Sequence, residues 1–131
     1  MLEVKDLTKS FGSLKVLKGI SFKVDKGEVL VVVGPSGCGK TTLLNIIGGL
    51  DKLDRGNLYI DNLDLDKLSP KKLDAYRNSM VGFVFQSFNL INHLNVYDNI
   101  ALTLKLNKEK NKNIKAKVQE IINKVGLTGK E

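Results

Sequence analysis

A glycine-rich segment between an apolar run and a helical pattern most constrains what this chain can fold into. Residues 34–41 read GPSGCGKT, which matches G-x-x-x-x-G-K-[ST] at every fixed position. Glycines allow positive φ angles and close backbone approach, so consecutive N–H groups can surround an anion where the next helix begins. Lys40 adds a positive charge, and the Thr41 hydroxyl can bind a Mg²⁺ ion that also holds phosphate. The segment therefore predicts a site for the phosphates of a nucleotide.

The sequence on either side of this loop supports the prediction. Residues 29–33 form an unbroken, mostly β-branched apolar run, typical of a strand that is buried on both faces of a parallel sheet. After the loop, apolar residues recur at helical spacing, and a Gly-Gly pair at 48–49 marks the helix end. The apolar positions of that helix are Leu43, Leu44, Ile46, Ile47 and Leu50. A strand, a loop and a helix in this order indicate an α/β fold and argue against a chance glycine turn.

Further elements follow from alternation, capping residues and apolar spacing. Partial alternation over residues 2–7 and clear alternation over 20–24 predict two half-exposed antiparallel strands, and residues 25–28 form a turn into the buried strand. A short strand is expected at 58–60 and a second buried strand at 80–85. Ser69 with Pro70, and Asn95 with Asp98, each indicate a helix start. The predicted helices after the first are at 70–78, 95–106 and 114–125, the last ending at Gly126.

Length and composition restrict the class of protein. A chain of 131 residues suffices for one small domain, and 42% apolar and 27% charged residues are ordinary for a soluble protein. No apolar run approaches the ~18 residues that span a bilayer, and the N-terminus lacks the pattern of a signal peptide. The single cysteine, Cys38, agrees with a reducing compartment. Cys38 occupies a variable position of the loop, where a small space-filling role is favoured over a redox role.

Positive charge gathers toward the C-terminal end. The net charge is +7, and residues 101–131 hold eight lysines against three glutamates. Such a cluster could contact nucleic acid, but the chain has only two arginines, Arg55 and Arg77, and no aromatic residue after Tyr97 lies among the lysines. A solvated helix face is therefore favoured, and no nucleic-acid partner is expected.

The motifs together resemble a known family. Phe11 follows the first strand, VLKGISF occupies 16–22, the Walker A loop follows, and GFVFQ occupies 82–86. This order resembles the N-terminal half of the ATPase domain of ATP-binding cassette (ABC) transporters. Residues 46–51 and 83–90 further resemble the subgroup that serves lipoprotein-releasing and macrolide-export systems. The resemblance implies a P-loop NTPase (RecA-like) core with an N-terminal antiparallel β subdomain, incomplete at the C-terminal side. Residues 1–131 would form one partial domain, with an antiparallel portion (1–28), a core portion (29–90) and the start of a helical subdomain (91–131).

The resemblance also implies roles for single residues. Phe11 would stack on adenine, although a buried core phenylalanine is the alternative. Gln86 would contact Mg²⁺ and the attacking water, although it could simply end a strand. With Lys40 it would form the catalytic pair, and Thr41 with Gln86 would form the metal site. His93 falls in the loop that docks against a permease. The nucleotide contacts would be Phe11, Gly34, Ser36, Gly37, Cys38, Gly39, Lys40, Thr41 and Thr42.

The implied function is ATP binding within a transporter ATPase that couples MgATP hydrolysis to substrate export. Its partners would be a membrane permease, contacted through residues 88–105, and a second ATPase domain in a head-to-tail dimer at the inner face of the cell membrane. The L-S-G-G-Q loop, the Walker B strand and the switch histidine of the family do not occur in these 131 residues. We therefore expect a fragment whose apolar strands expose edges and faces, marginally stable or prone to aggregation, and inactive alone.

Three other functions remain open from the sequence. A stand-alone regulatory module could bind nucleotide without catalysis, and a non-transport ABC ATPase could act on DNA or ribosomes. A small P-loop kinase shares the loop pattern, but 33 residues precede the loop here, and kinases of that type place it directly after the first strand.

Overall fold

The computed structural model describes residues 1–107 and 109–130. The chain divides into two compact units, Met1–Phe83 and Val84–Glu131. Residues 84–90, which the sequence grouped with the loop-bearing core, therefore belong to the second unit. Each unit has its own hydrophobic core and is described by itself.

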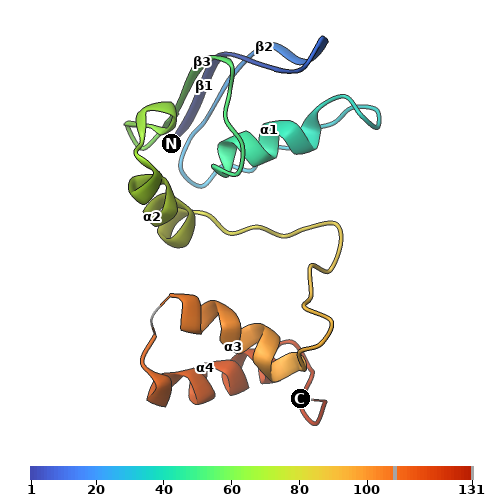
Figure 1. Cartoon of the computed structure of the whole chain (residues 1–131), viewed down its shortest axis with the longest axis vertical. Coiled ribbons are helices and arrows are strands. Elements are labelled where there is room, and N and C mark those ends of the chain that lie inside the picture. Colours follow the sequence, from blue (N-terminus) through green and yellow to red (C-terminus); the bar gives the residue numbers. More distant parts are fainter. Residues whose placement is uncertain (108, 131) are drawn as a thin grey trace. The chain divides into compact units, whose positions relative to one another are not determined.

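A four-stranded antiparallel sheet forms the frame of the first unit (Figure 1). Its strands are β1 (Leu2–Phe11), β2 (Leu14–Val24), β3 (Arg55–Ile60) and β4 (Leu63–Asp64), in the order β2-β1-β3-β4. The β1–β2 hairpin pairs Leu2 with Val24 at one end and Phe11 with Leu14 at the other. The predicted antiparallel β portion is confirmed, and its strands are longer than the alternating pattern indicated.

Two α-helices and a short 3₁₀ segment complete the first unit: α1 (Lys40–Ile47), η1 (Leu65–Lys67) and α2 (Pro70–Met80). Helix α1 ends just before the predicted Gly48–Gly49 pair, and Leu43 and Ile46 of its apolar face are buried. Leu44 and Leu50, assigned to the same face, are each 53% exposed. Helix α2 begins at Pro70 as predicted and ends at Met80. The buried core consists of Val4, Leu7, Leu17, Leu43, Ile46, Leu58, Leu65 and Tyr76.

The two predicted buried strands do not form. Residues 29–33 have no regular secondary structure, and Val29 and Val33 are 90% and 83% exposed. Residues 81–85 are also irregular, and Val84 is fully exposed. A central strand needs neighbours that supply hydrogen bonds at both edges and cover both faces. Within residues 1–107 and 109–130 neither segment pairs with a strand, so the expected exposure is confirmed while the expected strand conformation is wrong.

The second unit is built on two helices, α3 (Val96–Leu106) and α4 (Asn111–Lys124), which lie side by side (Figure 1). Asn95 caps α3 as predicted, because its side-chain oxygen accepts a hydrogen bond from the Asp98 amide at 2.7 Å. The core is Ala101 of α3 packed against the i, i+4, i+8 face of α4, formed by Ile114, Val118 and Ile122. In the described part of the chain no helix combines the length and apolar character needed to cross a membrane.

Candidate nucleotide-binding site

Backbone geometry at Gly39 fixes the start of α1. Gly39 caps the helix in the left-handed conformation (φ 99°, ψ 8°), and its carbonyl oxygen accepts the first helical hydrogen bond from the Leu43 amide at 2.9 Å. A Cβ atom at Gly39 would lie 2.8 Å from Cγ1 of Val16 and 2.9 Å from Cδ2 of Leu17. Glycine is therefore required here both for conformation and for space. The end of the loop therefore packs closely against β2, and α1 begins at that point.

Lys40, the first residue of α1, holds its ammonium group against the loop. Lys40 Nζ donates to the carbonyl oxygens of Gly34 and Pro35, each at 2.8 Å. The first turn of α1 has no acidic side chain, so the partial positive charge of the helix N-terminus and the lysine charge are not opposed there. The site therefore favours an anion on electrostatic grounds.

A hollow of about 430 Å³ lies between the loop and β2. Two loop residues, Gly37 and Cys38, form one side of it. Its volume falls within the range of small-molecule sites, and its wall combines apolar side chains with two lysines. The β2 residues in the wall are Leu14, Lys15, Val16, Lys18 and Ile20. Lys15, Val16 and Lys18 were not recognised from the sequence, because their place beside the loop depends on how the hairpin folds back.

Phe11 lies at the hairpin end next to this hollow, since it pairs with Leu14. Its side chain is 52% exposed, so Phe11 is not a buried core residue. The structure thus brings Phe11, the glycine loop and Lys40 into one unit, with the hollow between the loop and β2.

A partly buried ion pair lies beside Phe11 and was missed from the sequence. Lys9 is 9% exposed, and its Nζ donates to Oδ1 of Asp51 at 2.9 Å and to the carbonyl oxygen of Lys52 at 2.7 Å. The hydrogen bond from Lys9 lowers the pKa of the Asp51 carboxyl, against the opposing effect of burial. The alternation of β1 could have indicated the burial of Lys9, because Lys9 lies two residues beyond buried Leu7 and so faces the same side of the strand.

The residues predicted for the metal are exposed. Thr41 lies in the first turn of α1, and Gln86 lies in a bend of the second unit. His93 belongs to the second unit as well, whereas Thr41 and the loop belong to the first. No group of three or more His, Cys, Asp or Glu side chains that could hold a metal occurs in the described ranges. A threonine hydroxyl next to a phosphate loop fits Mg²⁺, which takes most of its ligands from water and phosphate.

A glycine loop that caps a helix beside an antiparallel β portion defines a P-loop nucleotide-binding protein. The family model described as "ABC transporter" matches residues 17–131. The chain belongs to the ABC transporter family, and the sequence-based assignment is confirmed.

Individual relatives agree with this membership. The lipoprotein-releasing system ATP-binding protein LolD of Bacteroides thetaiotaomicron is 41% identical over 98% of this chain and 59% of its own length. The methionine import ATP-binding protein MetN of Clostridium tetani is 42% identical over 99% of this chain and 41% of its own length. A dimeric ATP-binding cassette, MJ0796, in a post-hydrolysis state bound to ADP and Pi, superposes with a TM-score of 0.82 at 35% identity, covering 94% of this chain and 56% of that one.

These coverages limit what passes from the relatives to this chain. The chain spans less than two thirds of the length of each of these relatives. Proteins named for lipoprotein release and for methionine import match it at nearly the same identity, so sequence identity does not separate the directions of transport.

Proposed function

We propose that this chain is the nucleotide-binding portion of an ABC transporter ATPase and binds MgATP at the loop of residues 34–42. The observation that carries the proposal is the loop itself. Left-handed Gly39 starts α1, and the Lys40 ammonium already rests on two loop carbonyls. A solved relative that superposes over 94% of this chain is described as bound to ADP and Pi.

Each residue of the first unit would act on a different part of the nucleotide. Backbone N–H groups of Gly34 and of residues 36–42 would surround the phosphates, with Ser36 and Cys38 lining the loop. Lys40 would exchange its two carbonyl acceptors for phosphate oxygens, a stronger charge-assisted interaction. Thr41 would hold the Mg²⁺ ion, whose positive charge offsets phosphate charge. Phe11 would stack on the base.

Hydrolysis would belong to a complete ATPase domain of this family. Phosphoryl transfer depends on positioning water and on stabilising charge around the phosphates. In this proposal Gln86 reaches the metal and the attacking water, and a second ATPase domain completes the site head to tail. The 131-residue chain would bind MgATP without measurable turnover.

A membrane permease is the partner that we propose for residues 88–105. Phe88 is 93% exposed and Leu90 is 61% exposed. Beside them an apolar hollow is lined by residues from the loop and from α3, mainly Leu90, Ile91, Leu94, Val96, Asn99 and Ile100. The ATPase would act at the cytoplasmic face of the cell membrane. Export is favoured by the resemblance of residues 46–51 and 83–90 to the lipoprotein-releasing subgroup.

Binding of MgATP to the chain tests the proposal by titration calorimetry. Lys40→Ala is expected to weaken binding by roughly 1.5–3 kcal/mol, about ten- to 150-fold, the scale of a lost charge-assisted contact. Lys71→Ala is the matched control, because Lys71 is an exposed lysine of α2 in the same unit. A folded Lys40→Ala variant with unchanged affinity, or an equal loss in the Lys71→Ala variant, would remove Lys40 from the phosphate site.

A further inference from the structure

Lys9 is a charged side chain of the first unit that is only 9% exposed, and the loop chemistry above makes no use of it. Within the described residues it is the only charged side chain classed as buried. Burying an ammonium group is costly unless acceptors replace its water. Lys9 has two such acceptors, a carboxylate oxygen of Asp51 at 2.9 Å and the Lys52 carbonyl oxygen at 2.7 Å. Its position is therefore fixed by strong hydrogen bonds.

The same ammonium lies over the Phe11 ring. The distance from Lys9 Nζ to the ring centroid is 5.1 Å, within the range of a cation–π interaction. Lys9 and Phe11 are two residues apart on β1, so their side chains leave the strand on one side. One ring face meets the ammonium while about half of the Phe11 side chain remains exposed. The exposed part of the ring is available to a ligand.

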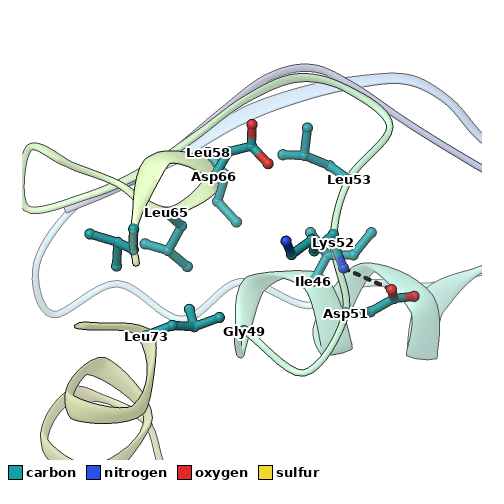
Figure 2. Close-up of a pocket in the computed structure, with 10 residues that line it drawn as sticks. Ile46, Gly49, Asp51, Lys52, Leu53, Leu58, Leu65, Asp66 and Leu73 are labelled. Atoms are coloured by element: carbon teal, nitrogen blue, oxygen red, sulfur yellow. Dashed lines mark hydrogen bonds between the residues drawn. The ribbon is translucent and has the colours of Figure 1, made fainter. Parts of the chain in front are cut away.

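The acceptors of Lys9 are tied to the end of α1. Two amides that follow the helix, those of Leu50 and Asp51, donate to the Asn45 carbonyl oxygen at 2.8 and 3.2 Å. The Lys52 amide donates to Oδ1 of Asp51 at 2.7 Å and orients that carboxylate (Figure 2). The carboxylate that holds Lys9 therefore lies just after α1 and is tied to its C-terminal end, while Lys40 is the first residue of the same helix.

Two hydrogen bonds of Asp54 join the segment after α1 to β1, one on each side of Lys9. The Asp54 amide donates to the Thr8 carbonyl oxygen at 2.9 Å, and the Ser10 amide donates to Oδ2 of Asp54 at 2.6 Å. Lys9 thus lies in a stretch of β1 that is fixed relative to α1.

We propose that Lys9 is a positioning residue for recognition of the nucleobase. Held by Asp51 and Lys52, its ammonium occupies one face of Phe11 and keeps the ring oriented so that a base stacks on the other face. A ring ordered before binding loses less conformational entropy when the base arrives. This inference rests on the proposed nucleotide site, and it adds a link between the base-binding and phosphate-binding ends of that site.

Comparing two ligands separates base positioning from phosphate binding. Lys9→Met keeps the aliphatic stem and removes the charge. It should weaken ATP binding about three- to tenfold, the scale of a partly desolvated cation–π contact, and leave the affinity for inorganic tripolyphosphate unchanged. Lys9→Arg, which keeps a cation at this place, should restore much of the ATP affinity. Lys5→Met is the control. Lys5 lies on β1 like Lys9, and its ammonium is 5.7 Å from the centroid of a different ring, that of Tyr59 on β3. This substitution should change neither affinity.

A double-mutant cycle with Phe11→Ala tests whether Lys9 acts through the ring. In the Phe11→Ala background, Lys9→Met should cause no further loss of ATP affinity. A further loss there, an equal loss for both ligands, or no loss of ATP affinity in Lys9→Met would each overturn the positioning role. Failure of the unsubstituted chain to bind either ligand would instead refute the proposed nucleotide site.

A second variant keeps the inference testable if Lys9→Met does not fold. Asp51→Asn preserves side-chain size and removes the charged acceptor that holds Lys9. The expected result is again a loss of ATP affinity with tripolyphosphate binding unchanged. An unchanged ratio of the two affinities in folded Asp51→Asn would contradict the proposal.

Discussion

Asp51 has a charge state that the fold controls, because its carboxyl receives the hydrogen bond of a buried ammonium. That bond holds the pKa of Asp51 below its usual value of 3.8. A depressed carboxyl pKa stabilises the folded state fully above the unfolded value, and this contribution is lost as pH falls through the lower folded value. The stabilisation by Asp51 should therefore be present at neutral pH and disappear at acidic pH below 3.8.

Asp51→Asn tests this linkage. The variant should be less stable than the unsubstituted chain at neutral pH, and the difference should shrink as the pH is lowered below the usual carboxyl value of 3.8. Urea midpoints of both proteins at a series of pH values give the comparison, and taking their difference removes the contributions of the other carboxylates. A gap that stayed constant from neutral to acidic pH would show that the ion pair does not set the Asp51 pKa.

Residues whose role is local could be predicted from the sequence, and residues whose role depends on distant partners could not. Gly39 and Asn95 act on helices that begin beside them: the loop motif predicted a helix directly after it, and the capping preference of asparagine predicted the start of α3. Lys9 and Asp51 are 42 positions apart, and no local pattern joins them. Phe11 was singled out through a family resemblance, while its exposure and its cationic neighbour required the folded hairpin.

Helices depend on local sequence, whereas the predicted buried strands at residues 29–33 and 80–85 depend on distant partners. Helices satisfy most of their backbone hydrogen bonds internally, so α1, α2, α3 and α4 begin or end close to their sequence signals. The run at residues 29–33 has the composition of a central strand, but a strand exists only with a neighbour. The composition of this run correctly indicated an apolar segment. Its conformation depends on hydrogen bonding to a neighbouring strand, and composition carries no information about that neighbour.

The loop before α3 depends on one side chain for its shape. The Asn99 side-chain oxygen accepts from the Ile91 amide at 2.9 Å, and its Nδ2 donates to the carbonyl oxygens of Leu94 and Asn95 at 3.0 and 2.9 Å. These bonds satisfy backbone groups at the helix N-terminus and order the segment proposed to face the permease. Asn99→Ala should destabilise the second unit by about 1–3 kcal/mol, since partly buried groups lose their partners.

Hydrogen exchange can locate that effect. In Asn99→Ala, the amides of residues 91–95 should exchange faster, and those of α1 in the first unit should be unchanged. Thr103→Ala is the matched control, because Thr103 is exposed on the same helix. If the control accelerated exchange at 91–95 as much as Asn99→Ala, or if Asn99→Ala had no effect there, the side chain would not be what orders the loop.

At the scale of the whole molecule, apolar side chains gather on a segment that no described strand covers. In the run Val29–Val33, every residue is between 37% and 90% exposed. An uncharged, mostly β-branched segment that pairs with no strand among the described residues is a template for pairing with a second chain. We therefore expect the chain to associate reversibly through this run.

Sedimentation velocity over a wide range of concentration measures this association. Val31→Lys places a charge at the centre of the run and should shift the chain toward the monomer. Leu106→Lys is the control, because Leu106 has the same 73% exposure as Val31 but lies outside the run, at the end of α3. A native chain that stays monomeric at every concentration would contradict the prediction. If association occurs through the run, a charge should matter more there than elsewhere. Equal effects of the two substitutions would therefore show that association depends on exposed apolar area in general and not on the run.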